Sequence, residues 1–123
     1  MHIGSRYTEY AEIERHIPNK EQIYGKCDSH DIPDGAQFVD VREADEYADG
    51  HAAGAINIPL SELMGRYQEL DFDQPAYIIC LSGGRSTRAC QFLEQNGLDV
   101  INVKDGTLAW REANLPMETG AGD

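Results

Sequence analysis

A cysteine stands at the end of an apolar run and directly before a loop that contains two glycines and an arginine. The run is Tyr77-Ile-Ile-Cys80, and the chain continues as Leu81-Ser-Gly-Gly-Arg85. Glycine permits the left-handed backbone angles of a tight reversal. Such a loop, with a helix behind it, directs backbone N–H groups and the helix dipole toward one point and favours an anion there. We therefore expect Cys80 to be a nucleophilic thiolate and Arg85 to hold an anionic substrate.

The loop and the first helical turn are expected to supply the remaining substrate-binding groups. These groups come from Leu81, Ser82, Gly83, Gly84 and Ser86. No acidic residue occurs between Gln74 and Leu93, which makes this segment locally basic in a chain of formal charge −12. The alternative is that Cys80 is a packed core thiol, since free cysteine is among the most buried residue types. The adjoining Gly-Gly-Arg sequence favours the nucleophile.

The elements that must position Cys80 alternate between short apolar strands and helices. Strands or extended segments are predicted at 37–41, 55–58, 76–80 and 98–103. Helical segments are predicted at 43–48, from a Ser61 cap to about 70, at 85–95 and at 107–113. This alternation predicts an α/β fold, a small parallel-sheet sandwich with helices on both faces. Ligands of such sheets bind beyond the carboxyl ends of the strands, where Cys80 lies.

The length of 123 residues fits one domain. We place the domain at 37–117 and a flexible tail at 118–123. Residues 1–36 are either part of the same domain or an extension, with a helix considered at 8–16. The start of the chain lacks the pattern of a signal peptide and no apolar run is long enough to span a membrane, so we expect a cytoplasmic protein without a membrane partner. The charge of −12 argues against binding to nucleic acid.

The other titratable residues are given structural or solvent-exposed roles. Cysteines 27, 80 and 90 are odd in number and form no C-x-x-C pair, so reduced thiols are expected. Cys90 is expected to pack in a helix, and the alternative is a resolving thiol. Cys27 and His30 have no second pair at metal-binding spacing, so we expect neither a metal nor a cofactor. A solvated face is expected for Glu43, Asp45, Glu46 and Asp49.

The Cys80 loop resembles the active-site loop of the rhodanese (sulfurtransferase) superfamily, in which four residues separate a cysteine from an arginine. The resemblance extends upstream to Val39-Asp-Val-Arg-Glu43 and Gly50-His-Ala-Ala-Gly-Ala-Ile-Asn-Ile-Pro59. Downstream it includes Asp105-Gly-Thr-Leu-Ala-Trp110 and Leu115-Pro116. These stretches follow the order of the family across about 37–117, most of the chain. The chain departs from the common family pattern in three places, at Ala52-Ala53, at Asp105 and at Asn114.

The resemblance implies a persulfide cycle. The Cys80 thiolate would take the outer sulfur of thiosulfate or a similar donor, and a thiol, cyanide or a protein cysteine would remove it. Asp40 and Arg42 would support the loop, and His51 would be a structural turn residue rather than a general base. Related phosphatases and arsenate reductases have one more residue between cysteine and arginine, so phosphatase activity is not expected.

Two other interpretations remain beside the sulfurtransferase. The first is a rhodanese fold that serves as a protein-docking module with little or no catalysis, which the presence of Cys80 and Arg85 argues against. The second is a thiol redox or arsenate-reducing enzyme, which the four-residue loop disfavours.

Overall fold

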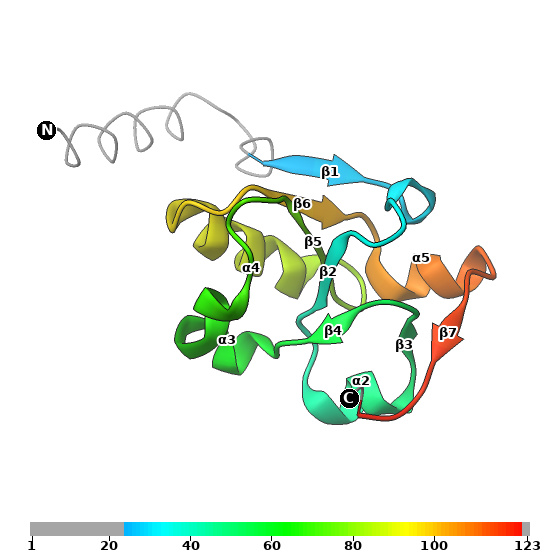
Figure 1. Cartoon of the computed structure of the whole chain (residues 1–123). Coiled ribbons are helices and arrows are strands. Elements are labelled where there is room, and N and C mark those ends of the chain that lie inside the picture. The colour runs from blue at the N-terminus through cyan, green and yellow to red at the C-terminus, as the bar shows by residue number, and fades with distance from the viewer. Residues whose placement is uncertain (1–23, 122–123) are drawn as a thin grey trace, which may run out of the picture.

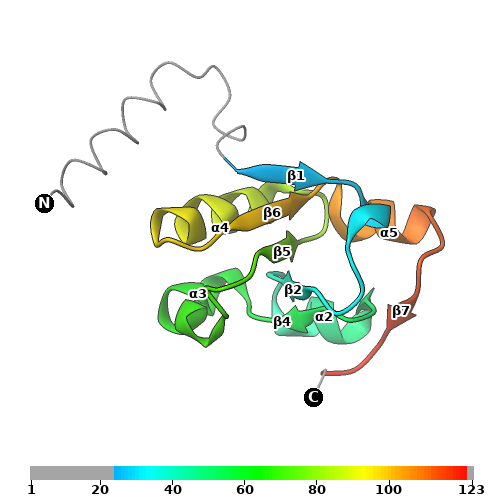
Figure 2. The same ribbon diagram turned by 45° about the horizontal axis from the view of Figure 1, so that its top comes forward.

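A five-stranded sheet forms the centre of the computed structural model, which describes residues 24–121 (Figures 1 and 2). All neighbouring strands in this sheet are parallel, in the order β1-β6-β5-β2-β4. A separate antiparallel pair joins β3 to β7. The strands are β1 (Gly25–Cys27), β2 (Gln37–Asp40), β3 (His51–Ala52), β4 (Ile56–Asn57), β5 (Ala76–Ile79), β6 (Val100–Val103) and β7 (Met117–Glu118).

Helices cover both faces of the parallel sheet, which confirms the predicted α/β sandwich. Helices α3 and α4 pack on one face and α5 packs on the other. The helical elements are η2 (Ser29–Asp31), α2 (Ala44–Asp49), α3 (Leu60–Arg66), η3 (Tyr67–Glu69), α4 (Gly84–Gln95) and α5 (Gly106–Glu112). Within residues 24–121, none of the helices has the length and apolarity required to cross a membrane.

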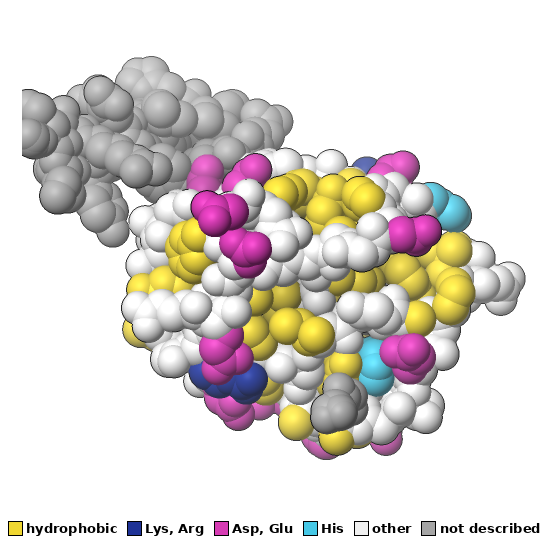
Figure 3. All heavy atoms as spheres, in the orientation of Figure 1, with side chains coloured by type: hydrophobic (Ala, Val, Ile, Leu, Met, Phe, Trp, Pro, Cys, Tyr) yellow, Lys and Arg dark blue, Asp and Glu magenta, His cyan; other side chains and the backbone are white. Residues whose placement is uncertain are grey.

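The alternation of side chains along each strand divides the core into two clusters. On β2, Val39 packs toward α3 and α4, whereas Phe38 packs toward α5 and lies 5.6 Å, between ring centroids, from Trp110. The cluster beneath α3 and α4 is the larger of the two and contains Cys80 and Cys90. Figure 3 shows apolar side chains that reach the surface between β1 and β4, with acidic side chains around them.

The register of the sheet brings the carboxyl ends of β2 and β5 together. Asp40 is paired with Ile79, and the Val41 N–H donates a hydrogen bond of 2.9 Å to the Ile79 carbonyl oxygen. From β2 the chain continues to β4 on one side, and from β5 it continues to β6 on the other. The β2–β5 junction is therefore the switch point of the sheet, where open α/β sheets bind ligands. Cys80 follows β5 at this junction.

The helix after β4 begins and ends differently from its prediction. Ser61 does not cap it, because α3 already begins at Leu60, behind Pro59. Proline suits this position since its fixed φ is compatible with a helix start. The Ser61 hydroxyl donates instead to the Glu43 carboxylate at 3.0 Å. The regular helix stops at Arg66, and a 3-10 turn replaces its predicted last part.

The two ends of the described chain form short strands that were not predicted. Strand β1 pairs with β6, so the part of the N-terminal segment from Gly25 onward belongs to the sheet. The predicted loose tail is wrong for its first residues, because Glu118 is paired with His51 in the β3–β7 pair. The Gly120 N–H also donates to the Ala48 carbonyl oxygen at 2.8 Å. The helix considered at 8–16 lies outside the described residues.

Two leucines of the helices provide a matched test of this core. Leu93 of α4 is fully buried, whereas Leu108 of α5 is 47% exposed. We expect Leu93→Ala to lower the free energy of unfolding by about 2–5 kcal/mol and Leu108→Ala by less than about 1 kcal/mol. Urea denaturation followed by far-UV circular dichroism measures both. Equal losses would contradict the packing of α4 on the sheet.

Candidate active site

Cys80 lies at the inner end of the loop that joins β5 to α4. Its side chain is 1% exposed. The Gly83 N–H donates to Cys80 Sγ at 3.1 Å, and Ser86 Oγ lies 3.4 Å from the same sulfur. The Ser86 hydroxyl donates in turn to the Gly83 carbonyl oxygen at 3.1 Å. The loop therefore folds back over the sulfur and surrounds it with polar groups.

Only one of the two loop glycines uses a left-handed conformation. Gly83 has a φ of 118° and caps α4, where its carbonyl oxygen accepts hydrogen bonds from the N–H and the hydroxyl of Thr87. Gly84 is the first residue of α4 and does not have a positive φ, so Gly83 alone uses the backbone freedom that the two glycines permit. The first N–H groups of a helix have no partner within the helix. The sequence Gly84–Ser86 thus presents amides at the loop that suit an anion.

The amino end of α5 holds the Cys80 loop by hydrogen bonds to two of its carbonyl oxygens. The backbone N–H and the hydroxyl of Thr107 both donate to the Cys80 carbonyl oxygen, at 2.8 and 2.9 Å. The Leu108 N–H donates to the Leu81 carbonyl oxygen at 3.1 Å. A Cβ atom at Gly106, whose φ is 57°, would collide with the carbonyl oxygens of Cys80 and Leu81. Gly106 and Thr107 were not singled out as site residues, although both lie in the Asp105–Trp110 stretch that carries the resemblance.

Asp40 and Arg42 form a buried ion pair at the end of β2. Arg42 Nε lies 3.1 Å from both Asp40 carboxylate oxygens, and Arg42 Nη2 also donates to the Gly50 carbonyl oxygen at 2.7 Å. The Asn57 side chain joins the same turn by donating to the carbonyl oxygens of Asp40 and Arg42, at 3.0 and 2.9 Å. A buried pair with these additional hydrogen bonds is well compensated. These hydrogen bonds hold the end of β2 next to the end of β5, where Cys80 follows. Asp40 and Arg42 are the two residues that the resemblance implied as supports of the loop.

His51 belongs to the turn region and not to the sulfur. Its Nδ1 lies 2.7 Å from the Tyr47 carbonyl oxygen, and its ring stacks on the Tyr47 ring with centroids 3.6 Å apart. Its Nε2 lies 3.7 Å from a carboxylate oxygen of Glu118 on β7. One ring nitrogen therefore faces the Tyr47 carbonyl oxygen and the other faces the Glu118 carboxylate, an arrangement that fits a structural residue better than a general base.

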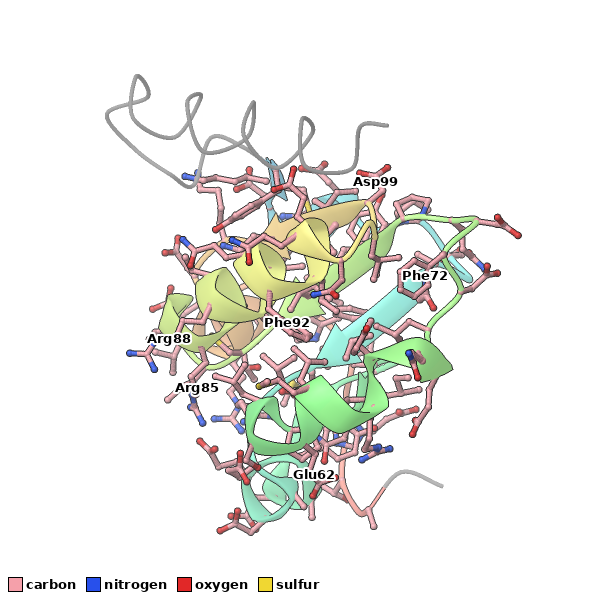
Figure 4. All side chains as sticks on the ribbon, turned by 90° about the vertical axis from the view of Figure 1, so that its left-hand side faces the viewer. Glu62, Phe72, Arg85, Arg88, Phe92 and Asp99 are labelled. Carbon is pink, nitrogen blue, oxygen red and sulfur yellow. The ribbon has the colours of Figure 1, made fainter. Side chains whose placement is uncertain are left out.

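Arg85 is held by an acidic residue of α2. Its Nη1 and Nη2 donate to Glu46 Oε1 and Oε2, at 2.6 and 3.0 Å. Figure 4 shows Arg85 and Arg88 at the beginning of α4, with Arg85 on the side that faces α2. The expected solvated face is therefore wrong for Glu46, although Glu43, Asp45 and Asp49 are exposed. The hydrogen bonds from Arg85 lower the pKa of Glu46 to about 2.

The two other cysteines sit in surroundings that keep their thiols protonated. Burial, with Asp31 and Asp28 nearby, raises the pKa of Cys27 to about 11. Burial in α4 chiefly raises the pKa of Cys90, with smaller contributions from Cys80 and Glu94. Both cysteines are free, and Cys90 is buried in the helix as expected. Within the described part of the chain, no group of three or more His, Cys, Asp or Glu side chains could hold a metal ion.

Comparison with known proteins decides the family. The profile of the rhodanese-like domain matches residues 21–113. The chain belongs to the rhodanese-like family. The match includes the Cys80 loop, the Asp40–Arg42 pair and α5, and it confirms the resemblance on which the sequence analysis relied.

Relatives and solved structures of the family span bacteria and archaea. The chain is 46% identical over 76 residues to the uncharacterized protein YqhL of Bacillus subtilis, covering 61% of this chain and 60% of YqhL. It is 36% identical over 88 residues to the thiosulfate sulfurtransferase GlpE of Actinobacillus pleuropneumoniae, covering 70% and 81% of the two chains. The crystal structure of a rhodanese-related protein from Thermoplasma volcanium superposes with a TM-score of 0.72 at 35% identity, covering 77% of this chain and 98% of that one.

The contact between Gly106 and the loop can be tested by adding a single methyl group. We expect Gly106→Ala to lower the free energy of unfolding by about 2 kcal/mol or more, because the new Cβ meets backbone atoms that cannot move aside and the φ is left-handed. In Gly65→Ala the same change falls in α3, where a Cβ meets nothing, so stability should rise slightly. Thermal unfolding of both variants measures these changes in stability. A Gly106→Ala protein as stable as the wild type would contradict the close contact between Gly106 and the loop.

The ion pair predicts how Glu46 titrates. Its folded pKa lies below the ordinary value of 4.5, so the pair stabilises the fold above that pH and loses its contribution as the pH falls from about 4.5 toward 2. The carbon-13 chemical shift of the Glu46 carboxylate should therefore have a midpoint near pH 2. Arg85→Gln should return the midpoint toward the ordinary value, whereas Arg88→Gln should leave it in place. A wild-type midpoint near 4.5 would show that the pair does not form in solution.

Proposed function

We propose that the protein is a sulfurtransferase that moves sulfane sulfur from thiosulfate or a similar donor to a thiophilic acceptor through a persulfide on Cys80. The observation that supports this most directly is the hydrogen bond from the Gly83 N–H to Cys80 Sγ at the start of α4. A backbone donor and a helix N-terminus together stabilise negative charge on sulfur. The relative GlpE, named a thiosulfate sulfurtransferase, points in the same direction.

The first half of the reaction loads the sulfur. The Cys80 thiolate attacks the outer sulfur of thiosulfate, a new S–S bond forms, and the S–S bond of thiosulfate breaks. Sulfite leaves with the electron pair of that bond, and Cys80 carries the persulfide. A cysteine that attacks as the thiolate needs no general base in this step.

The loop suits the charge of this intermediate. The outer sulfur extends about 2 Å beyond Sγ and carries the negative charge. The amides of residues 81–86 can then donate hydrogen bonds to it, as the Gly83 N–H already does to Sγ. With four residues between Cys80 and Arg85, the ring suits a single sulfur atom rather than a tetrahedral phosphate. Arg85, at the opening of the loop, would orient the donor.

The second half of the reaction unloads the sulfur. An acceptor nucleophile attacks the outer sulfur of the persulfide, and the Cys80 thiolate leaves with the electron pair and is regenerated. Cyanide would give thiocyanate, and a thiol or a cysteine of a partner protein would give a new persulfide. Because α4 and α5 hold the loop by backbone hydrogen bonds, Cys80 returns to the same surroundings after each cycle.

Intact-mass spectrometry of the purified protein tests the proposal. Incubation with thiosulfate should add one sulfur atom to the protein, and cyanide should remove it. Cys80→Ser should show no gain, whereas Cys27→Ser and Cys90→Ser should gain sulfur as the wild type does. Absence of any gain on the wild type would refute thiosulfate as a donor and favour the docking module. A disulfide of Cys80 with Cys27 or Cys90 would indicate a thiol redox enzyme.

A further inference from the structure

Glu46 occupies the part of Arg85 that would otherwise receive an anion. Both terminal nitrogens of the guanidinium donate to the two carboxylate oxygens of Glu46, at 2.6 and 3.0 Å. This is the paired geometry in which arginine binds carboxylates and other planar oxyanions. An oxyanionic donor that approaches Arg85 must therefore displace Glu46 or accept a less favourable position on the guanidinium.

The Glu46 carboxylate is held in place by its own helix. Glu46 is the third residue of α2, and its Oε1 also accepts the Glu43 N–H at 3.1 Å, which completes a capping box. The Glu43 carboxylate is fixed in turn by the Ser61 hydroxyl of α3. The side chains of Glu46 and Arg85 are each only 33% exposed. The pair is thus a preorganised contact between α2 and α4 rather than a chance meeting of two surface side chains.

The electrostatic effect of Glu46 depends on the charge of the donor. The carboxylate is ionised at neutral pH and cancels the charge of Arg85, and it also repels an anion at the same opening. The repulsion is proportional to the charge of the anion, so a dianion such as thiosulfate loses about twice as much as a monoanion. Arg42 offers no substitute, because it is buried and its Nε and Nη2 donate to Asp40 and to the Gly50 carbonyl oxygen.

We propose that Glu46 is a specificity-determining residue that reserves Arg85 and selects against dianionic oxyanion donors in favour of alkyl persulfides, R–S–SH. This inference rests on the proposed function, because it assigns a donor class to the same Cys80 site. An alkyl persulfide carries at most one negative charge on its sulfurs and needs no oxyanion contact. Thiosulfate remains a substrate of this site, but a poor one.

The reaction with an alkyl persulfide balances without a further reactant. The Cys80 thiolate attacks the terminal sulfur of R–S–SH, and a new S–S bond forms while the S–S bond of the donor breaks. The thiolate R–S⁻ leaves with the electron pair, and the proton stays on the transferred sulfur. The products are the Cys80 persulfide and one thiolate, so charge and oxidation state are conserved.

The variant Glu46→Gln tests this assignment. Glutamine has nearly the same shape and also completes a capping box at this position, so α2 should keep its fold. The matched control is Glu69→Gln, which removes the same charge from another Arg–Glu pair, with Arg66, in the segment that leads to the amino end of β5. Both proteins are compared with the wild type by thermal unfolding and by steady-state kinetics.

Thiosulfate and 2-hydroxyethyl persulfide, which has no carboxylate, serve as the two donors, each with cyanide as the acceptor and with the uncatalysed rate subtracted. We expect Glu46→Gln to lower the KM for thiosulfate at least fivefold, with kcat changed less than twofold. Its KM for 2-hydroxyethyl persulfide should change less than twofold, and Glu69→Gln should behave as the wild type with both donors. The thiosulfate effect should shrink at 0.5 M salt, because screening weakens the repulsion. Arg88 is present in all three proteins, so its contribution cancels.

Three outcomes would overturn the inference. An unchanged KM for thiosulfate in a folded Glu46→Gln protein would show that Glu46 does not compete for Arg85. A raised KM for thiosulfate would show that Glu46 holds Arg85 in its binding position. An equal fall in this KM in Glu69→Gln would show that the effect comes from the net charge of the protein and not from Glu46. Failure of the proposed function is a different result, in which neither donor loads sulfur on Cys80 in any of the proteins.

Discussion

The site depends on the contact between two carbonyl groups of the Cys80 loop and the amino end of α5. The carbonyl oxygens of Cys80 and Leu81 accept hydrogen bonds from Thr107 and Leu108. In a trans peptide the N–H points away from the C=O. Holding these two carbonyls against α5 therefore turns the N–H groups of the next residues away from α5. The polarity of the loop follows from this contact, which requires the absence of a side chain at Gly106.

The charges at the opening of the loop are balanced in pairs. Asp40 neutralises Arg42 in the interior, and Glu46 neutralises Arg85 nearer the solvent. In a chain of formal charge −12, the positive potential that acts on the sulfur therefore comes mainly from backbone dipoles rather than from free cations. Peptide groups do not titrate, and those of the Cys80 loop are held in position by the hydrogen bonds to α5. A site of this kind stabilises charge within a narrow region and attracts distant anions only weakly.

The sequence predicted the features that depend on neighbouring residues. Apolar runs and helical spacing indicated β2, β5 and α4, and the glycine-containing loop after Cys80 indicated the reversal at Gly83. The two-residue strands β3 and β7 have no periodic pattern, and they form because two segments far apart in the sequence meet, with His51 opposite Glu118 and Ala52 opposite Met117. The partner of Arg85 lies 39 residues away on another helix, so no local pattern marks Glu46. The need for glycine at position 106 could not be predicted from its neighbours either, because it comes from the close approach of the Cys80 and Leu81 carbonyl oxygens.

Helix α5 also carries Trp110, the single tryptophan of the chain. Its indole is nearly buried against Phe38, and its Nε1 donates to the Pro116 carbonyl oxygen at 2.7 Å. Three residues earlier, the same helix holds the carbonyl oxygen of Cys80 through Thr107. A shift of the loop during sulfur loading would thus reach the indole along one short helix. The protein therefore contains its own fluorophore one helical turn from the residue that holds the carbonyl group of the proposed nucleophile, and it has no second indole.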